Sequence, residues 1–358
     1  MASTTARRLV VLPALFLLWA LVVLASPVAM VVAGVVDGVR RAKGSPTVRL
    51  VVFALAYLSF EVAGVLAAFA LWVTRPWRPE RWAARNHRLQ QWWTESLVRV
   101  AGPVLGLRLT IDEVDPDDPG APPGVVPVGA PGPVVVVSRH VSIVDSLLPA
   151  HRLGVEGDRR LRYVLTQGLR LDPCLDIVGH RLPNHFVVRG GEDRSAEIAA
   201  LESLAAGMGA DEAAVIFPEG GLFSPARRER MIRRLAERES SRLPVARSLR
   251  HLLAPRAAGT LALLRAAPDA DVVVLAHHGM EPIASFAALW RNVPLTRPVR
   301  VRLTRYRRHG LPSDDEGLAH WLDDQWAAMD GWLDRATRAV GAPDRAGADP
   351  SHRSSATR

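Results

Sequence analysis

The sequence predicts an α/β protein with a mixed, largely parallel sheet flanked by helices, preceded by an N-terminal two-helix membrane hairpin. Short runs of β-branched residues alternate with helical stretches from about residue 104 onwards, which is the pattern of a layered α/β domain. Two long apolar runs lie ahead of that region. Hydrophobic residues make up 49% of the 358 residues although 23% are charged, and this apolar content excludes an intrinsically disordered chain.

The predicted hairpin, residues 1–76, contains two runs that are long enough to cross a membrane. Residues 9–36 carry no charge, and residues 50–74 carry only Glu61, whereas about 20 apolar residues span a hydrocarbon core. A cleaved signal peptide is an alternative for the first run, but a second run follows it. A carboxylate in mid-membrane is costly unless it is paired or protonated, so Glu61 is expected to face a partner such as the first helix.

Basic residues around the two runs predict their orientation. Seven arginines lie outside the pair and four basic residues lie between the runs, so the positive-inside rule places the N-terminus and the following domain in the cytoplasm. The outer set is Arg7, Arg8, Arg75, Arg78, Arg81, Arg85 and Arg88, and the inner set is Arg40, Arg41, Lys43 and Arg49. Four charges are awkward to translocate, so a hairpin that dips into one leaflet remains an alternative to two full spans. Both arrangements predict a protein of the cell membrane.

The charge balance points to an anionic partner. A formal net charge of +9 favours contact with lipid head groups, phosphates or nucleic acid. Tryptophans are interleaved with arginines in residues 75–100, which is typical of a membrane interface, although an amphipathic helix packed on a domain has the same composition. Because this segment directly follows the apolar runs, we expect membrane lipid as the partner and no nucleic acid. The single cysteine, Cys174, excludes an internal disulfide framework.

Residues 77–340 are expected to form one α/β domain, and residues 341–358 a disordered tail. The expected strands are 105–111, 134–137, 161–165, 185–188, 213–217, 272–276 and 299–306. The expected helices are 144–153, 193–206, 225–239, 257–267 and 315–339, the third of them capped by Ser224. A Pro- and Gly-rich loop, 112–133, separates the first two strands, and its composition argues against any regular element there.

Chemistry is expected just beyond the strands, because open α/β sheets bind ligands at the carboxyl ends of their strands. His140 and Asp145 follow the valine strand. A histidine there can take a proton from an incoming hydroxyl, and a carboxylate five residues on can bind its other ring nitrogen. Taken alone, the pair is weak evidence, since a helix cap or a surface pair has the same spacing.

Two further strand ends carry candidate binding residues. Glu219 and Gly220 follow the strand 213–217 within Phe-Pro-Glu-Gly-Gly, where glycine allows a ligand to approach the backbone closely. Arg189 ends the strand 185–188 with a guanidinium suited to phosphate. Four other histidines show no metal-ligand spacing, and no metal site is expected.

These motifs together resemble the 1-acylglycerol-3-phosphate acyltransferases, the glycerolipid family built around an H-x4-D motif and an FPEG motif. The matching residues are His140 and Asp145, Phe186 to Arg189, Phe217-Pro218-Glu219-Gly220, and the strand 272–276. The segment 251–259, HLLAPRAAG, is similar to the HLLPRxxG segment of the lysophosphatidate and lysocardiolipin acyltransferase-like branch, and Trp321 with Asp330 resembles that branch's C-terminal region. The resemblance covers roughly residues 77–333.

The resemblance implies the glycerolipid acyltransferase fold and direct transfer of an acyl chain to a hydroxyl. The donor would be acyl-CoA or acyl-carrier protein, the acceptor a lysophospholipid, and no cofactor would be needed. It assigns His140 as general base and Asp145 as the residue that orients it. Glu219 and Gly220 would position the acceptor, and Arg189 would hold its phosphate.

Two departures leave the acceptor open. The family usually continues FPEG with Thr-Arg, whereas Gly221 and Leu222 stand here. Arg139 replaces an asparagine that usually precedes the histidine, so phosphate binding would rest on Arg189, Arg139 or Arg227. The alternatives are a different acceptor, such as a glycolipid or aminolipid, or a lipid-binding relative without catalysis.

Overall fold

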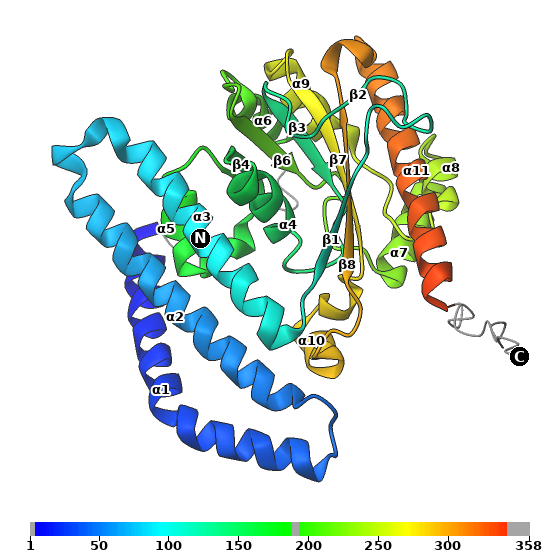
Figure 1. Ribbon diagram of the computed structural model, residues 1–358. Coiled ribbons are helices and arrows are strands. Elements are labelled where there is room, and N and C mark those ends of the chain that lie inside the picture. Colours follow the sequence, from blue (N-terminus) through cyan, green and yellow to red (C-terminus); the bar gives the residue numbers. More distant parts are fainter. Residues whose placement is uncertain (1–3, 188–192, 342–358) are drawn as a thin grey trace, which may run out of the picture.

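The computed structural model describes residues 4–187 and 193–341. Within them an eight-stranded sheet lies between two sets of helices (Figure 1). Its strands are β1 (Leu109–Glu113), β2 (Val125–Val126), β3 (Val134–Ser138), β4 (Arg160–Thr166), β5 (His185–Val187), β6 (Glu212–Ile216), β7 (Asp271–His278) and β8 (Val299–Tyr306). Their order is β1-β8-β7-β3-β6-β4-β5, with β2 on β8.

The sheet is mixed and largely parallel, as predicted. β3 pairs in parallel with both β6 and β7, and β4 pairs in parallel with β5 and β6. β8 runs antiparallel to β7 and parallel to β1. The four central valines of β3 are fully buried, because a strand with parallel neighbours and helices on both faces has no solvent-exposed side.

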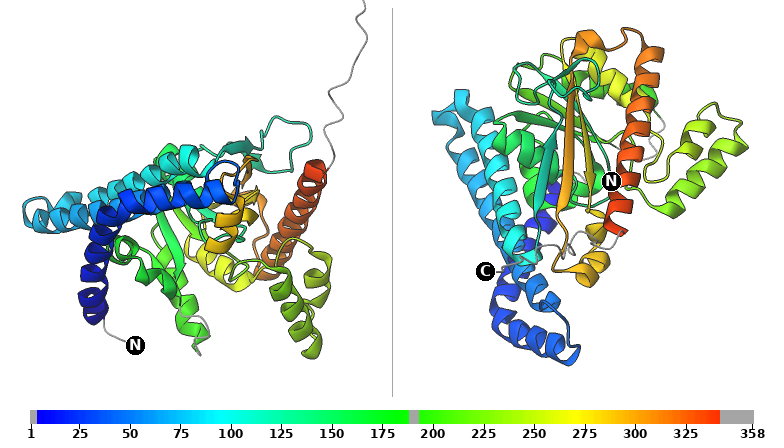
Figure 2. Two further views of the ribbon diagram at one scale, coloured as in Figure 1. Left: turned by 90° about the horizontal axis from the view of Figure 1, so that it is seen from below. Right: turned by 45° about the vertical axis from the view of Figure 1, so that its right-hand side comes forward.

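Helices cover both faces of the sheet. They are α4 (Leu147–Pro149), α5 (Pro173–Gly179), α6 (Arg194–Ala205), α7 (Pro225–Glu237), α8 (Leu243–Ser248), α9 (Ala257–Ala266), α10 (Phe286–Asn292) and α11 (Asp315–Gly341), with a π-helical turn, Ala150–Glu156, after α4. Apolar residues of α6, α9 and α11 pack in one core cluster with β3, β6 and β7. The π-helical turn and α10 contribute to the cluster on the other face. Figure 2 shows α7 and α8 projecting from the body of the molecule.

Three long helices precede the sheet. α1 (Thr4–Val39) and α2 (Pro46–Val73) are each long and apolar enough to cross a membrane. α3 (Trp82–Leu105) lies between α2 and the sheet (Figure 1). Its Trp93 is buried in a cluster with Ala68 of α2, whereas Trp92 and Trp77 are exposed. The segment therefore packs on the domain as an amphipathic helix and still exposes two of its tryptophans.

Glu61 on α2 is buried, but its partners are not on the first helix as we expected. Its Oε1 accepts a hydrogen bond from the indole N–H of Trp93 at 2.9 Å. Its Oε2 accepts one from the backbone N–H of Cys174 at 3.1 Å. The carboxyl group therefore joins α2 to α3 and α5, which places this side of α2 against protein.

Three sequence predictions are wrong in detail. The strand expected at 105–111 begins only at Leu109, because α3 extends to Leu105 and is ended by the left-handed Gly106. The loop 112–133 contains β2, which pairs with β8 through a long-range contact that composition does not encode. The helix expected at 144–153 is a turn, the short α4 and the π-helical turn, since Pro149 has no backbone N–H to give to a regular helix.

The remaining predicted elements are present with end shifts of no more than two residues inside the described segments. Ser224 caps α7 by accepting a hydrogen bond from the backbone N–H of Arg227, as predicted. The helices α5, α8 and α10 were not predicted, and each has no more than seven residues. Residues of the predicted tail, 342–358, and Val188 lie outside the described residues.

Candidate active site

The candidate residues meet at one edge of the sheet. β3 pairs in parallel with β6 on one side and with β7 on the other, so the carboxyl ends of the three strands lie together. His140 follows β3, Glu219 follows β6, and His277 stands at the end of β7. The edge thus gathers three titratable side chains that are far apart in the sequence.

His140 and Asp145 form the pair that the sequence predicts. The His140 Nδ1 and the Asp145 Oδ2 are 3.1 Å apart. The same oxygen accepts hydrogen bonds from the backbone N–H groups of Val141 at 2.5 Å and Ser142 at 2.7 Å. Asp145 is fully buried, so a turn of the chain closes around its carboxylate. This geometry fixes a tautomer with the proton on Nδ1, and Nε2 is left as the basic nitrogen of His140.

The second oxygen of Asp145 faces His277, one of the four histidines for which the sequence predicts no metal site. His277 is fully buried, and its Nε2 lies 3.6 Å from the Asp145 Oδ1. The same Nε2 donates to the backbone oxygen of Arg139 at 3.2 Å. Burial lowers the pKa of His277, which keeps the ring neutral beside the His140–Asp145 pair. The sequence does contain a signal for His277, because this residue directly follows the predicted strand 272–276, where site residues are expected.

Glu219 braces the backbone of the site. Its Oε1 accepts a hydrogen bond from the His140 N–H at 2.8 Å, and its Oε2 accepts one from the Leu253 N–H at 2.9 Å. The side chain is 3% exposed, and burial raises the pKa of Glu219 to about 8. With both oxygens bonded to main chain, Glu219 holds the strand ends together. Its predicted contact with the acceptor stays a prediction.

The turn after β6 is bound to His140 on a second side. The backbone N–H of Phe223 donates to the carbonyl oxygen of His140 at 2.7 Å. The His140 ring packs on the Phe217 ring, with 4.5 Å between ring centres. Gly220 has a φ of 65° and is exposed, a left-handed conformation that favours glycine. The predicted turn therefore lies directly beside His140.

Arg139 is buried and paired with a carboxylate, and its predicted contact with phosphate stays a prediction. Its side chain is 2% exposed, and it donates from Nη1 to Glu281 at 2.7 Å and to the His277 carbonyl at 2.6 Å. Although burial opposes ionisation, this guanidinium lowers the pKa of Glu281 to about 2. These contacts tie β3 to the segment after β7, and they give no support to phosphate binding by Arg139. Arg189, the other predicted phosphate ligand, lies outside the described residues.

The segment from Arg250 to Arg256 closes the site from the side of α11. Asp330 on α11 accepts hydrogen bonds from the backbone N–H groups of Arg250 and His251. Further along, Leu253 binds Glu219, and the Arg256 N–H donates to the Pro218 carbonyl at 2.9 Å. The segment that resembles HLLPRxxG therefore docks on the turn of the FPEG motif.

A small cavity is lined in part by Ser146, the residue that follows Asp145 in the sequence. It has a volume of about 50 Å³ and is lined mainly by apolar side chains of α3, β4 and α5, among them Trp93 and Leu175. Ligand pockets usually span ~300–1,000 Å³, so this cavity is too small for a fatty acyl chain. Within residues 4–187 and 193–341, no cluster of three His, Cys, Asp or Glu side chains is placed to hold a metal ion.

Comparison with known proteins finds a matching family. Residues 125–277 match the model of the family described as Acyltransferase. The match runs from β2 to β7 and contains His140, Asp145 and Glu219. No curated protein and no solved structure matches the chain. The segment that carries the site therefore matches an acyltransferase family, and this match supports an acyltransferase enzyme.

Proposed function

We propose that the chain is a membrane-bound O-acyltransferase that transfers a fatty acyl chain to the hydroxyl of a lysophospholipid such as 1-acylglycerol-3-phosphate. The donor is acyl-CoA or acyl-carrier protein. The observation that carries the proposal is the His140 ring, whose Nδ1 is held by the buried Asp145 while 17% of the side chain is exposed. A neutral imidazole fixed in this way is a general base for a hydroxyl.

The reaction follows from these positions. Nε2 of His140 takes the proton of the acceptor hydroxyl as the oxygen attacks the thioester carbonyl. The developing imidazolium is stabilised by Asp145, 3.1 Å from Nδ1. The tetrahedral intermediate then expels the thiolate, which takes the proton back from His140 and leaves as a thiol. An ester bond forms, a thioester bond breaks, and no acyl-enzyme is needed.

The two residues after the FPEG motif point to a second candidate acceptor. Gly221 and Leu222 stand where the family usually has Thr-Arg, so a glycolipid or aminolipid acceptor is the second candidate. A non-catalytic relative is disfavoured, because the match is to an enzyme family and the base and its partner are in contact.

The proposed location is the cell membrane, with the active site facing the cytoplasm. The support is the pair of apolar helices α1 and α2 and the larger number of basic residues outside the pair. α1 leaves large apolar side chains exposed along its length, including Leu9, Leu17, Leu21, Leu24, Val28, Val32 and Val35. Such a surface is stable in contact with lipid.

The test is acyl transfer from labelled acyl-CoA to a panel of lysolipids. We expect transfer to a phosphate-bearing lysolipid and a loss of about 10²–10⁴-fold in kcat for His140→Ala, the usual contribution of a general base. His309→Ala, a change at an exposed histidine, is the matched control and should keep the parent rate. Activity of His140→Ala equal to the parent's would contradict the mechanism, and transfer only to phosphate-free lipids would contradict the acceptor.

A further inference from the structure

We propose that Arg227 and Arg256 bind the phosphate group of the acyl acceptor, against the backbone of Gly220 and Gly221. The inference rests on the proposed function and names the groups that recognise its substrate. Neither arginine belongs to the FPEG motif, and they come from different elements, the first turn of α7 and the segment before α9.

The two glycines define where the guanidinium groups lie. A Cβ atom on Gly220 would be 3.1 Å from the Arg256 Cζ. A Cβ atom on Gly221 would be only 2.5 Å from the Arg227 Nη1. Because consecutive Cα atoms are about 3.8 Å apart, both guanidinium groups pack on the same short turn. The glycines make this close approach possible.

Hydrogen bonds hold both arginines in place through their backbones. The Arg256 N–H binds the Pro218 carbonyl at 2.9 Å, inside the same turn. Arg227 stands at the start of α7, where Ser224 caps the helix. Its neighbour Arg228 anchors α7 by donating to the carbonyl oxygens of Leu249 and Arg247. The backbones that carry the two guanidinium groups are therefore held by the fold.

The turn is joined to the general base on both of its flanks. Glu219 accepts from the His140 N–H at 2.8 Å, and Phe223 donates to the His140 carbonyl at 2.7 Å. Gly220 and Gly221 lie between these two anchors. An anion on the turn would therefore sit next to His140, where the phosphate of an acceptor must be if its hydroxyl is to reach Nε2.

The charges around the turn favour an anion. Arg256 is exposed, and the described part of the chain gives its side chain no ion pair. The charge of Arg139 is already neutralised by Glu281. A phosphate on the turn would accept charge-assisted hydrogen bonds from guanidinium groups that lie beside Gly220 and Gly221. The pair thus supplies the positive charge that Gly221-Leu222 lacks.

The test compares variants on acceptors with and without phosphate. The acceptors are 1-acylglycerol-3-phosphate and monoacylglycerol, and the donors are acyl-CoA and acyl-pantetheine, which lacks the nucleotide phosphates. We expect Arg256→Ala and Arg227→Ala to raise the KM for the phosphate-bearing acceptor about 10- to 100-fold, the loss expected for a charge-assisted contact. The KM for monoacylglycerol and for both donors should not change. Arg256→Lys should restore part of the loss.

Two further variants make the test specific. Gly221→Ala keeps every charge but pushes the Arg227 guanidinium aside, so it should raise the KM for the phosphate-bearing acceptor only. Arg233→Ala removes an exposed charge from the same helix and should behave as the parent.

Three other outcomes would contradict the binding of the acceptor phosphate by Arg227 and Arg256. An increase in the KM for acyl-CoA but not for acyl-pantetheine would assign the arginines to the donor's phosphates and overturn the inference. Unchanged kinetics of both alanine variants in an enzyme that acylates 1-acylglycerol-3-phosphate would overturn the inference alone. A parent enzyme that acylates no phosphate-bearing lipid would overturn the proposed acceptor and the inference with it.

Discussion

Glu219 shows how one buried side chain can hold two backbone segments of a site together. Its two oxygens bind the backbone at His140 and at Leu253, residues that belong to opposite sides of the sheet edge. Burial favours its neutral form, whereas two N–H donors favour the carboxylate. Burial is the larger effect, and it raises the pKa of Glu219 to about 8.

This pKa predicts how stability depends on pH. The folded value of about 8 exceeds the ordinary value of 4.5, so the folded chain keeps a proton that the unfolded chain releases. The stabilisation is complete below pH 4.5 and is lost as the pH rises to about 8. We expect the Tm of the detergent-solubilised enzyme to fall across this range, and Glu219→Gln to show a flatter profile.

Glu237→Gln, a change at an exposed carboxylate, serves as the control and should keep the parent's pH profile. A parent Tm that rises with pH over this range, and loses that rise in Glu219→Gln, would show that the carboxylate form is the stable one.

The candidate residues for the reaction are easier to predict from the sequence than the residues that hold them in position. His140 and Asp145 are visible because they follow a valine strand at a recognisable spacing. The contacts of Asp330 and Arg256 depend on segments that meet only in the folded chain. Arg139 shows that a sequence neighbour of the candidate histidine need not face a ligand. Its guanidinium is buried and pairs with Glu281.

At the scale of elements, the long and strongly patterned segments were predictable. The β-branched strands and the two apolar helices are set by local composition. Short elements were not, since a seven-residue helix such as α5 or α10 has too few turns to show periodicity. The π-helical turn after α4 is equally invisible, because its local sequence is also compatible with an ordinary helix.

One of these missed helices, α10, carries a surface that fits a membrane. Phe286 is 79% exposed and Trp290 is 46% exposed, while Leu289 between them is buried. α10 follows β7 and contacts α2. The Arg40 guanidinium at the end of α1 lies 5.7 Å from the Trp290 ring centre. The apolar surface of the hairpin therefore continues onto the edge of the sheet that holds His140.

This continuity predicts that α10 helps the enzyme to reach acceptors in a bilayer. We expect Phe286→Ser combined with Trp290→Ser to lower kcat/KM on vesicle-embedded lysolipid roughly five- to tenfold, because two large apolar contacts with lipid are lost. Activity on a water-soluble, short-chain acceptor should stay at the parent level.

Ile111→Ser changes an exposed apolar residue on the edge strand β1 and is the control for general effects of lost surface hydrophobicity. An equal loss on both acceptors in the α10 variant would indicate damage to the active site and would contradict a role in membrane contact.

At the scale of the whole molecule, the hairpin is fastened to the acyltransferase segment at both ends of α1. Near the N-terminus, Arg7 and Arg8 pair with Asp176 of α5 at 2.5 and 2.6 Å. Beyond the other end of α1, Arg49 in the first turn of α2 donates from Nη1 to the carbonyl oxygens of Pro103 and Val104 at the end of α3. α1 is bent and lies along the molecule (Figures 1 and 2).

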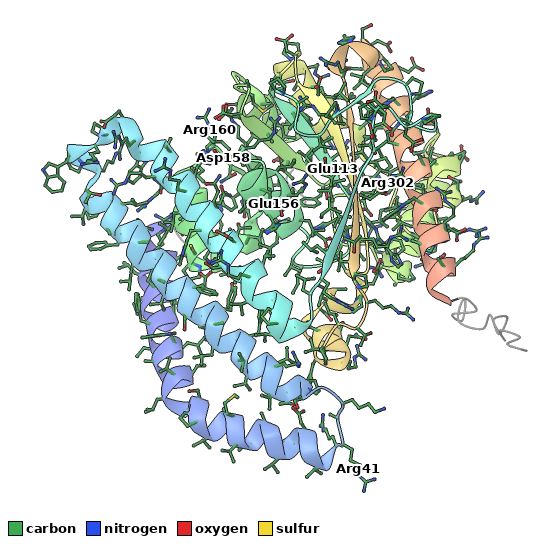
Figure 3. All side chains as sticks on the ribbon, viewed as in Figure 1. Arg41, Glu113, Glu156, Asp158, Arg160 and Arg302 are labelled. Carbon is green, nitrogen blue, oxygen red and sulfur yellow. The ribbon has the colours of Figure 1, made fainter. Side chains whose placement is uncertain are left out.

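These contacts favour the one-leaflet hairpin over two full spans. A helix of 36 residues is about 54 Å long at 1.5 Å per residue, more than a hydrocarbon core of about 30 Å. A spanning α1 would carry the turn to the far side of the membrane. In the structure the turn contains Arg41 (Figure 3), and the neighbouring Arg40 guanidinium lies against Trp290 of α10. The basic side chains of the turn are then not translocated.

The prediction can be tested with single cysteines in a Cys174→Ala background, because Cys174 is the one cysteine of the chain. Lys43→Cys reports on the turn and Asp117→Cys on the domain, and both positions are exposed. We expect a membrane-impermeant maleimide to label both in inside-out vesicles and neither in right-side-out vesicles. Labelling of Lys43→Cys from the outer face, with Asp117→Cys protected there, would instead establish two full spans. In that case the contacts of Arg49 with α3 and of Arg40 with α10 would have to break in the membrane. The exposed apolar side chains of α10 would then not continue the lipid-contacting surface of the hairpin.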